Sequence, residues 1–193
     1  MKPRTLFGLV VASLAAFASA DPQPQSPLPR IGVAETLALP DFAPGPDGKD
    51  LPITGLSGIT WLGDDRYAAI MDNSDRLLVF RLDLESDGTP RAVREPRIVI
   101  LSRHFDYEDI ATCPPRLAAR VAQRNHVRGE PGPGRCLVVC EETTPALRAI
   151  DLDSGKLVGQ IPIPKNLTEP RPNRGLEALT TAPEGTTLWT ANE

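Results

Sequence analysis

The stretch GLSGITWLGDDRYAAIMDN at residues 55–73 decides the fold, because the chain repeats it in altered form as GLEALTTAPEGTTLWTANE at residues 175–193. Both copies begin with a Gly-Leu pair, and a polar residue follows it, Ser57 in the first copy and Glu177 in the second. Fifteen residues further on, both copies reach a second polar landmark, DN or NE. A phrase of this length written twice indicates an internal structural repeat.

A third copy lies between these two. Its first landmark is Glu108 in DYEDIATC, and its second is the pair Glu141-Glu142 in CLVVCEE. Glu108 follows Ser57 by 51 residues and precedes Glu177 by 69, and the two landmarks of this middle copy lie 33 residues apart rather than 15. Both intervals are 18 residues too long, so one loop insertion within residues 114–135 explains both and leaves an underlying period of 51.

Each unit consists of short β-like runs separated by Gly, Pro, Asp and Asn. The predicted strands are residues 56–62, 66–72, 76–84 and 96–102 in the first unit, 107–113, 136–142, 146–153 and 157–164 in the second, and 176–182 and 187–193 in the third. A further strand is predicted for AETLALP at residues 34–40, and only PRLAARVAQR has a helical period.

Periods of about 40 to 50 residues with several short strands per unit are typical of β-propeller blades. The sequence therefore predicts an all-β protein, and more specifically a β-propeller of which this chain carries about two and a half four-stranded blades. The third unit has only two strands, so we expect the chain to be the N-terminal part of a longer protein. A small sandwich built from the same ten strands is the alternative.

The predicted domain occupies residues 31–193 and follows two other segments. Residues 1–20 read as a secretory signal, since Lys2 and Arg4 precede a short apolar run that ends in an A-x-A site. An N-terminal anchor helix is the alternative. Residues 21–30, DPQPQSPLPR, read as a proline-rich linker. We therefore expect an exported protein, periplasmic or extracellular, and the Arg-, Ala- and Pro-rich composition suggests a bacterial host.

The net charge of the chain is −4, and removal of the signal would make it more acidic. Its basic residues are scattered rather than gathered in an arm or stripe, which argues against nucleic acid as the partner. No stretch after the signal is apolar enough to cross a bilayer. We expect the complete protein to be a monomer.

Three cysteines occur in the chain. Cys113 ends one predicted strand and Cys136 begins the next, so a disulfide between them would close the base of the intervening loop. Cys140 is expected to be a small buried side chain. Zinc and a catalytic thiol are disfavoured, because neither a cluster of His nor a paired Cys motif accompanies these residues.

The repeated landmarks are mostly acidic. In a radial array of blades, the start of the innermost strand and the end of the strand beside it lie close together, so the carboxylates would converge at one end of the central channel. The candidate metal ligands are Asp72, Glu108, Glu141, Glu142, Glu177 and Glu193. Converging carboxylates repel one another unless they take up protons or a cation, and oxygen ligands favour calcium. The alternative is that they cap strand edges or bind water.

Arg174 lies in NRGLE, directly before the third copy. It could reach the same rim and bind a phosphate or carboxylate group of a substrate, or it could form a structural salt bridge with a neighbouring Glu. No G-x-S-x-G motif accompanies the two histidines, so the sequence gives no support to a Ser-centred hydrolase. No catalytic residue can be assigned.

At these motifs the sequence resembles the family described as esterase-like activity of phytase, or phytase-like proteins. The resemblance rests on GLSGITW, DYEDIA, VVCEET and PNRGLEALTTAPEGTTLWTANE, within residues 51–193. It implies an exported β-propeller about twice the length of the domain present here. It also implies a calcium-dependent phosphoric ester hydrolase, in which the acidic residues hold metal ions and Arg174 steers phosphate. A non-catalytic propeller that binds ligands at its rim is the alternative function.

Overall fold

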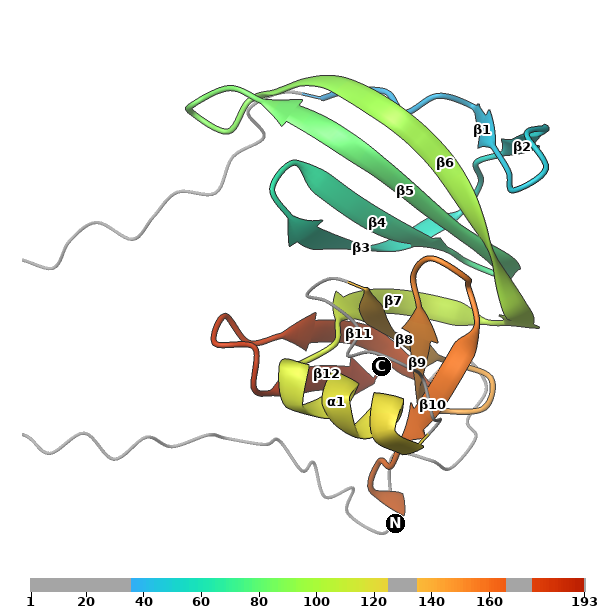
Figure 1. Cartoon of the computed structure of the whole chain (residues 1–193), viewed down its shortest axis with the longest axis vertical. Coiled ribbons are helices and arrows are strands. Elements are labelled where there is room, and N and C mark those ends of the chain that lie inside the picture. The colour runs from blue at the N-terminus through green and yellow to red at the C-terminus, as the bar shows by residue number, and fades with distance from the viewer. Residues whose placement is uncertain (1–35, 125–134, 166–174, 193) are drawn as a thin grey trace, which may run out of the picture. The chain divides into compact units, whose positions relative to one another are not determined.

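The computed structural model describes residues 36–124, 135–165 and 175–192. Within them the protein is an all-β chain with several antiparallel sheets and one helix (Figure 1). The elements are β1 (Phe42–Pro44), β2 (Asp50–Pro52), β3 (Leu56–Gly63), β4 (Arg66–Met71), β5 (Ser74–Leu84), β6 (Pro90–Phe105), β7 (Tyr107–Thr112), α1 (Pro115–Arg124), β8 (Cys136–Glu141), β9 (Ala146–Asp151), β10 (Leu157–Ile161), β11 (Leu176–Thr181) and β12 (Leu188–Asn192).

The predicted runs of the three units all form strands, and the helical stretch forms α1. In the first unit, β3, β4, β5 and β6 form a four-stranded sheet in which each strand pairs with the next one along the chain. In the second unit β7, β8, β9 and β10 repeat this order, and β11 pairs with β12 (Figure 1). All of these pairs are antiparallel. The all-β prediction is therefore confirmed, while the described strands form separate sheets rather than a closed ring.

The prediction of a strand at residues 34–40 was wrong for its described part. Residues 36–40 are irregular, because none of the described strands pairs with them, and Leu39 packs onto the first sheet instead. The chain then forms the short β1–β2 hairpin, which the sequence did not reveal. Gly48 supplies the positive φ of its turn, and this is a conformation that glycine adopts without a steric penalty.

Apolar side chains pack on both faces of the first sheet. One face carries Ile70 and Leu77 and packs against Ile110 and Val139 of the second sheet in the largest core cluster. The other face carries Leu78 and Phe80, and the segment that includes β1 and β2 covers it. Because successive side chains point to opposite faces of each strand, the sheet has a separate apolar core on each face.

The second sheet is likewise covered on both faces. Its face away from the first sheet carries Val138 and Cys140, which pack with Leu176 and Leu179 of the third unit. Helix α1 also contributes to this side of the sheet. Burial on both faces explains why β8 reads as the continuous apolar run CLVVC rather than as an alternating pattern.

Candidate metal centre

The first strands of the three units share one irregularity. In β3, β7 and β11 the register slips after the first paired residue, so that one residue of each strand bulges out of the ladder. The bulged residues are Ser57, Glu108 and Glu177. A β-bulge re-aims the side chain of its extra residue, and bulges are common beside functional sites. The first landmark of the repeat is therefore a recurring bulge.

The register also corrects the second landmark by one residue. Met71, Glu141 and Asn192 each pair with the first residue of the preceding strand, which makes these three positions equivalent. Asp72 therefore corresponds to Glu142 rather than to Glu141. Backbone hydrogen bonds agree with this assignment. The N–H of Asp72 donates to the carbonyl of Gly55 at 2.6 Å, and the N–H of Glu142 donates to the carbonyl of Asp106 at 3.0 Å.

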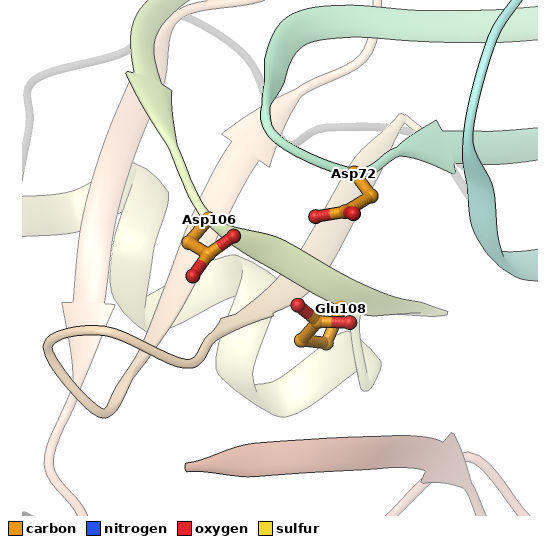
Figure 2. Close-up of side chains that lie close together, drawn as sticks. All are labelled: Asp72, Asp106 and Glu108. Atoms are coloured by element: carbon orange, nitrogen blue, oxygen red, sulfur yellow. The ribbon is translucent and has the colours of Figure 1, made fainter. Parts of the chain in front are cut away.

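Three carboxylates converge where the first unit meets the second. Asp72 lies in the tight turn between β4 and β5, Asp106 is the single residue between β6 and β7, and Glu108 is the bulged residue of β7. One carboxylate oxygen from each lies within 4.8 Å of those of the other two, and all three residues are half-buried. Figure 2 shows the three carboxylates facing one another.

The electrostatics of the cluster follow from this convergence. Partial burial raises the pKa of Glu108 to about 7, and repulsion by neighbouring carboxylates adds to the rise. These carboxylates are, in order of effect, Asp72, Glu177, Asp106 and Glu142. Removing a carboxylate from water and surrounding it with like charges both disfavour its ionised form. A bound cation would instead favour the ionised form of Glu108.

Two hydrogen bonds from the β8–β9 turn position Asp106. The Thr143 hydroxyl donates to Asp106 Oδ2 at 2.7 Å, and the N–H of Glu142 donates to the Asp106 carbonyl. The hydroxyl fixes one carboxylate oxygen, which turns the carboxyl group into a defined orientation. The sequence analysis did not select Asp106, although it stands two residues before Glu108. Its equivalents in the other copies are Gly55 and Gly175, so the repeat carried no acidic signal at this position.

The donor set fits calcium. Calcium–oxygen distances are about 2.3–2.6 Å, so two oxygens bound to one ion lie at most about 5 Å apart. The carboxylate oxygens of the cluster lie within 4.8 Å of one another, which falls within this range. Three carboxylates offer up to six oxygens, and calcium takes six to eight oxygen ligands in flexible geometry. The absence of a His or Cys side chain from the group disfavours zinc and copper.

Glu141 lies elsewhere. Its side chain is buried, with 2% of the residue exposed, and it accepts a hydrogen bond from Arg148 Nε at 2.7 Å. Arg148 in turn lies over the Phe105 ring, 4.0 Å from its centroid. Burial raises the pKa of Glu141, and the guanidinium partly offsets that effect. Glu141 thus forms a buried ion pair with Arg148, and it does not belong to the three-carboxylate group, although it is close enough to Asp106 for the two charges to interact.

The remaining predicted residues fall into two groups. Glu142 and Glu177 lie close enough to Glu108 to affect its pKa, although neither belongs to the three-carboxylate group. Arg174 and Glu193 lie outside the described residues, as do the predicted signal and linker. Their roles stay predictions.

The predicted disulfide pair is close together but not joined. Cys113 and Cys136 are free thiols in the structure, so the bridge between them stays a prediction. Cys140 is also free and fully buried, as expected. Its S–H donates to the Asp109 carbonyl at 3.7 Å.

Adjacent acids on β7 have different environments. Asp109 Oδ2 accepts a hydrogen bond from the N–H of Leu179 on β11 at 2.6 Å, and Oδ1 accepts one from its neighbour Ile110 at 2.8 Å. Burial raises the pKa of Asp109, and these two backbone donors oppose the rise. Glu108 therefore faces the cluster while Asp109 links the first strands of two units. The motif DYEDIA alone does not distinguish the two.

The fold and the cluster define an all-β protein of repeated antiparallel sheets with a cluster of three carboxylates at a junction between repeats. The family model described as esterase-like activity of phytase matches residues 51–193, and the chain belongs to this phytase-like family. A search of the curated proteins found no match. Among the residues that the structure describes, no helix combines the length and the apolar character needed to span a bilayer.

Proposed function

We propose that this protein is an exported, calcium-dependent phosphoric ester hydrolase, and that its site is the cluster of Asp72, Asp106 and Glu108. The convergence of these three carboxylates, within 4.8 Å of one another, is the observation that carries the proposal. Membership of the phytase-like family favours phosphate esters as the substrate class. The proposal of export rests on residues 1–20 of the sequence.

The chain's own residues have four roles at this site. Asp72, Asp106 and Glu108 supply oxygen ligands, and the Thr143 hydroxyl orients Asp106 among them. Glu142 and Glu177 add negative charge beside Glu108 and so increase the affinity for a cation. A bound calcium ion supplies electrostatic stabilisation of phosphate oxygens and lowers the pKa of a water molecule. Arg174 is proposed to hold a substrate phosphate.

We further propose that the sheets are consecutive blades of a β-propeller. In support, the first strands of successive units lie side by side: the Ser57 hydroxyl donates to the Tyr107 carbonyl at 3.0 Å, and Asp109 accepts from Leu179. On the face of the first sheet that carries Leu78 and Phe80, the segment with β1 and β2 leaves Ile59 and Trp61 of β3 uncovered, each 59% exposed. Such apolar faces are what further blades would cover.

The test combines calcium binding with ester hydrolysis in the full chain. Calcium uptake is measured by equilibrium dialysis, and phosphate release is measured from p-nitrophenyl phosphate and from phytate, with calcium or with chelator. We expect calcium-dependent release, and we expect Glu108→Gln to weaken calcium binding by more than about 10-fold. Asp50→Asn, at the exposed first position of β2, is the matched control, since it removes one carboxylate away from the cluster.

The outcomes separate two functions. Release at full rate in chelator would overturn the metal-dependent mechanism. Calcium binding that raises the melting temperature without any ester hydrolysis would instead favour the alternative, a non-catalytic module that binds ligands at its rim. The exposed Trp61 and Trp189, the latter 63% exposed, are the large side chains that such a module would offer.

A further inference from the structure

Cys113 and Cys136 continue the β7–β8 ladder by one step beyond its last regular pair. Thr112 is paired with Leu137, so the next two residues stand directly opposite each other. The N–H of Cys113 donates to the carbonyl of Cys136 at 2.9 Å, which closes that step. Directly opposed residues of antiparallel strands have Cα atoms about 4.5–5.5 Å apart, and this lies within the range that a disulfide spans.

The two side chains lie on the same face and interact directly. Residues opposite each other in an antiparallel pair point to the same side of the sheet. Both cysteines belong to one small apolar cluster with Leu117 and Ala118 of α1. The hydrogen bond between the thiols, together with burial, raises the pKa of the Cys113 thiol. A pair with such a shared hydrogen bond is already in mutual contact.

The third cysteine is excluded as a partner by strand geometry. Cys140 lies on the same strand as Cys136 and on the same face, but it is four positions away, or about 13 Å along a strand. Cys140 is instead paired with Asp109. Within the described part of the chain, the group of side chains suited to a metal ion is the acidic cluster, which contains neither cysteine of the pair.

We propose that Cys113 and Cys136 form a disulfide that joins the end of β7 to the start of β8. The oxidant is a small-molecule or protein disulfide, acting by exchange. One cysteine thiolate attacks it, forms a mixed disulfide and releases one thiol. The other cysteine then attacks the mixed disulfide and releases the second thiol. Two protein thiols are thus oxidised as one external disulfide is reduced to two thiols.

The shared hydrogen bond lowers the pKa of Cys136, so Cys136 is the more readily ionised thiol, whereas Cys113 is the more accessible one. The Cys113 side chain is half-buried, whereas Cys136 is 4% exposed and lies beneath α1. The closed loop contains α1, so the bond would limit the freedom of the helix in the unfolded chain and stabilise the folded one. This inference is independent of the acidic cluster and of any hydrolase activity.

The test uses the full chain in oxidised and in reduced glutathione, followed by thiol counting and peptide mapping. We expect the number of free thiols to fall from three to one, and we expect a cross-linked peptide containing residues 113 and 136. Oxidation should raise the melting temperature by roughly 5–10 °C. Cys140→Ser should keep this shift, and Cys113→Ser should abolish it.

Peptide mapping uses the unmodified chain, so its result does not depend on whether a cysteine variant folds. Three free thiols after oxidation, a stable glutathione adduct on Cys113, or a bridge that includes Cys140 would each overturn the proposal.

Discussion

Gly58 on β3 lies directly against Asp109 on β7. A methyl group added at residue 58 would come within 2.7 Å of the Asp109 Cα atom and 2.1 Å of its Oδ1. The first strands of the two units therefore approach so closely that one side must lack a side chain. The Asp109 side chain occupies the space beside Gly58 and accepts a hydrogen bond from the N–H of Leu179 in the third unit.

Gly58→Ala should destabilise the protein by about 1–3 kcal/mol, because the backbone of β7 cannot yield as a flexible side chain would. Urea unfolding followed by circular dichroism measures the effect. Thr180→Ala, at an exposed position of β11, provides a comparison that should change the midpoint little. Equal midpoints for Gly58→Ala and the unmodified chain would show that the strands do not approach as described.

Loss of Arg148 should lower the stability of the folded protein. Arg148→Met would leave Glu141 buried without its cation, and breaking such a pair typically costs about 3–5 kcal/mol. The exposed pair of Arg91 and Glu85 offers a control, and Arg91→Met should have little effect. The double variant Glu141→Leu with Arg148→Met should recover much of the loss. If the double variant is as unstable as the single one, the cost is not that of an unpaired charge.

The strands could be predicted from the sequence because apolar runs and turn residues alternate clearly, and because three copies of one phrase support one another. The position of Glu108 was predicted for the same reason. Asp106 was missed, since its equivalents are Gly55 and Gly175, and only the corner between β6 and β7 brings it into the cluster. Glu141 and Glu142 were both predicted as ligands, because sequence spacing cannot tell which of two adjacent acids pairs with Arg148.

Stability without calcium should fall as the pH rises from about 4.5 to about 7. The pKa of Glu108 is about 7 in the folded protein and 4.5 in its unperturbed state. The folded state therefore binds this proton more tightly than the unfolded state does, and folding is favoured at the acidic end of the window. Denaturant unfolding in chelator at several pH values measures this trend.

Glu108→Gln should flatten the decline, because glutamine does not titrate. Saturating calcium should oppose the decline as well, since the ion favours the ionised carboxylate. A decline of unchanged size in Glu108→Gln would assign it to another group.

Thr143→Val should weaken calcium binding by about 10-fold while changing the stability of the calcium-free protein little. The substitution removes the hydroxyl that donates to Asp106 Oδ2 and keeps the shape of the side chain. Calcium affinity is measured by titration calorimetry. Thr143→Ser retains the donor and should restore binding. A Thr143→Val protein with unaltered affinity would show that Asp106 needs no such support.

At the recurring bulge of β3, β7 and β11, strand pairing does not depend on which side chain is present. Because Ser57, Glu108 and Glu177 stand outside the ladders, each can be exchanged without breaking a strand pair. Descendants of one ancestral unit could thus diversify at this residue while keeping the same scaffold. A protein engineer could use the same freedom and replace the hydroxyl of Ser57 by an acid or an amide to tune which ion the junction prefers.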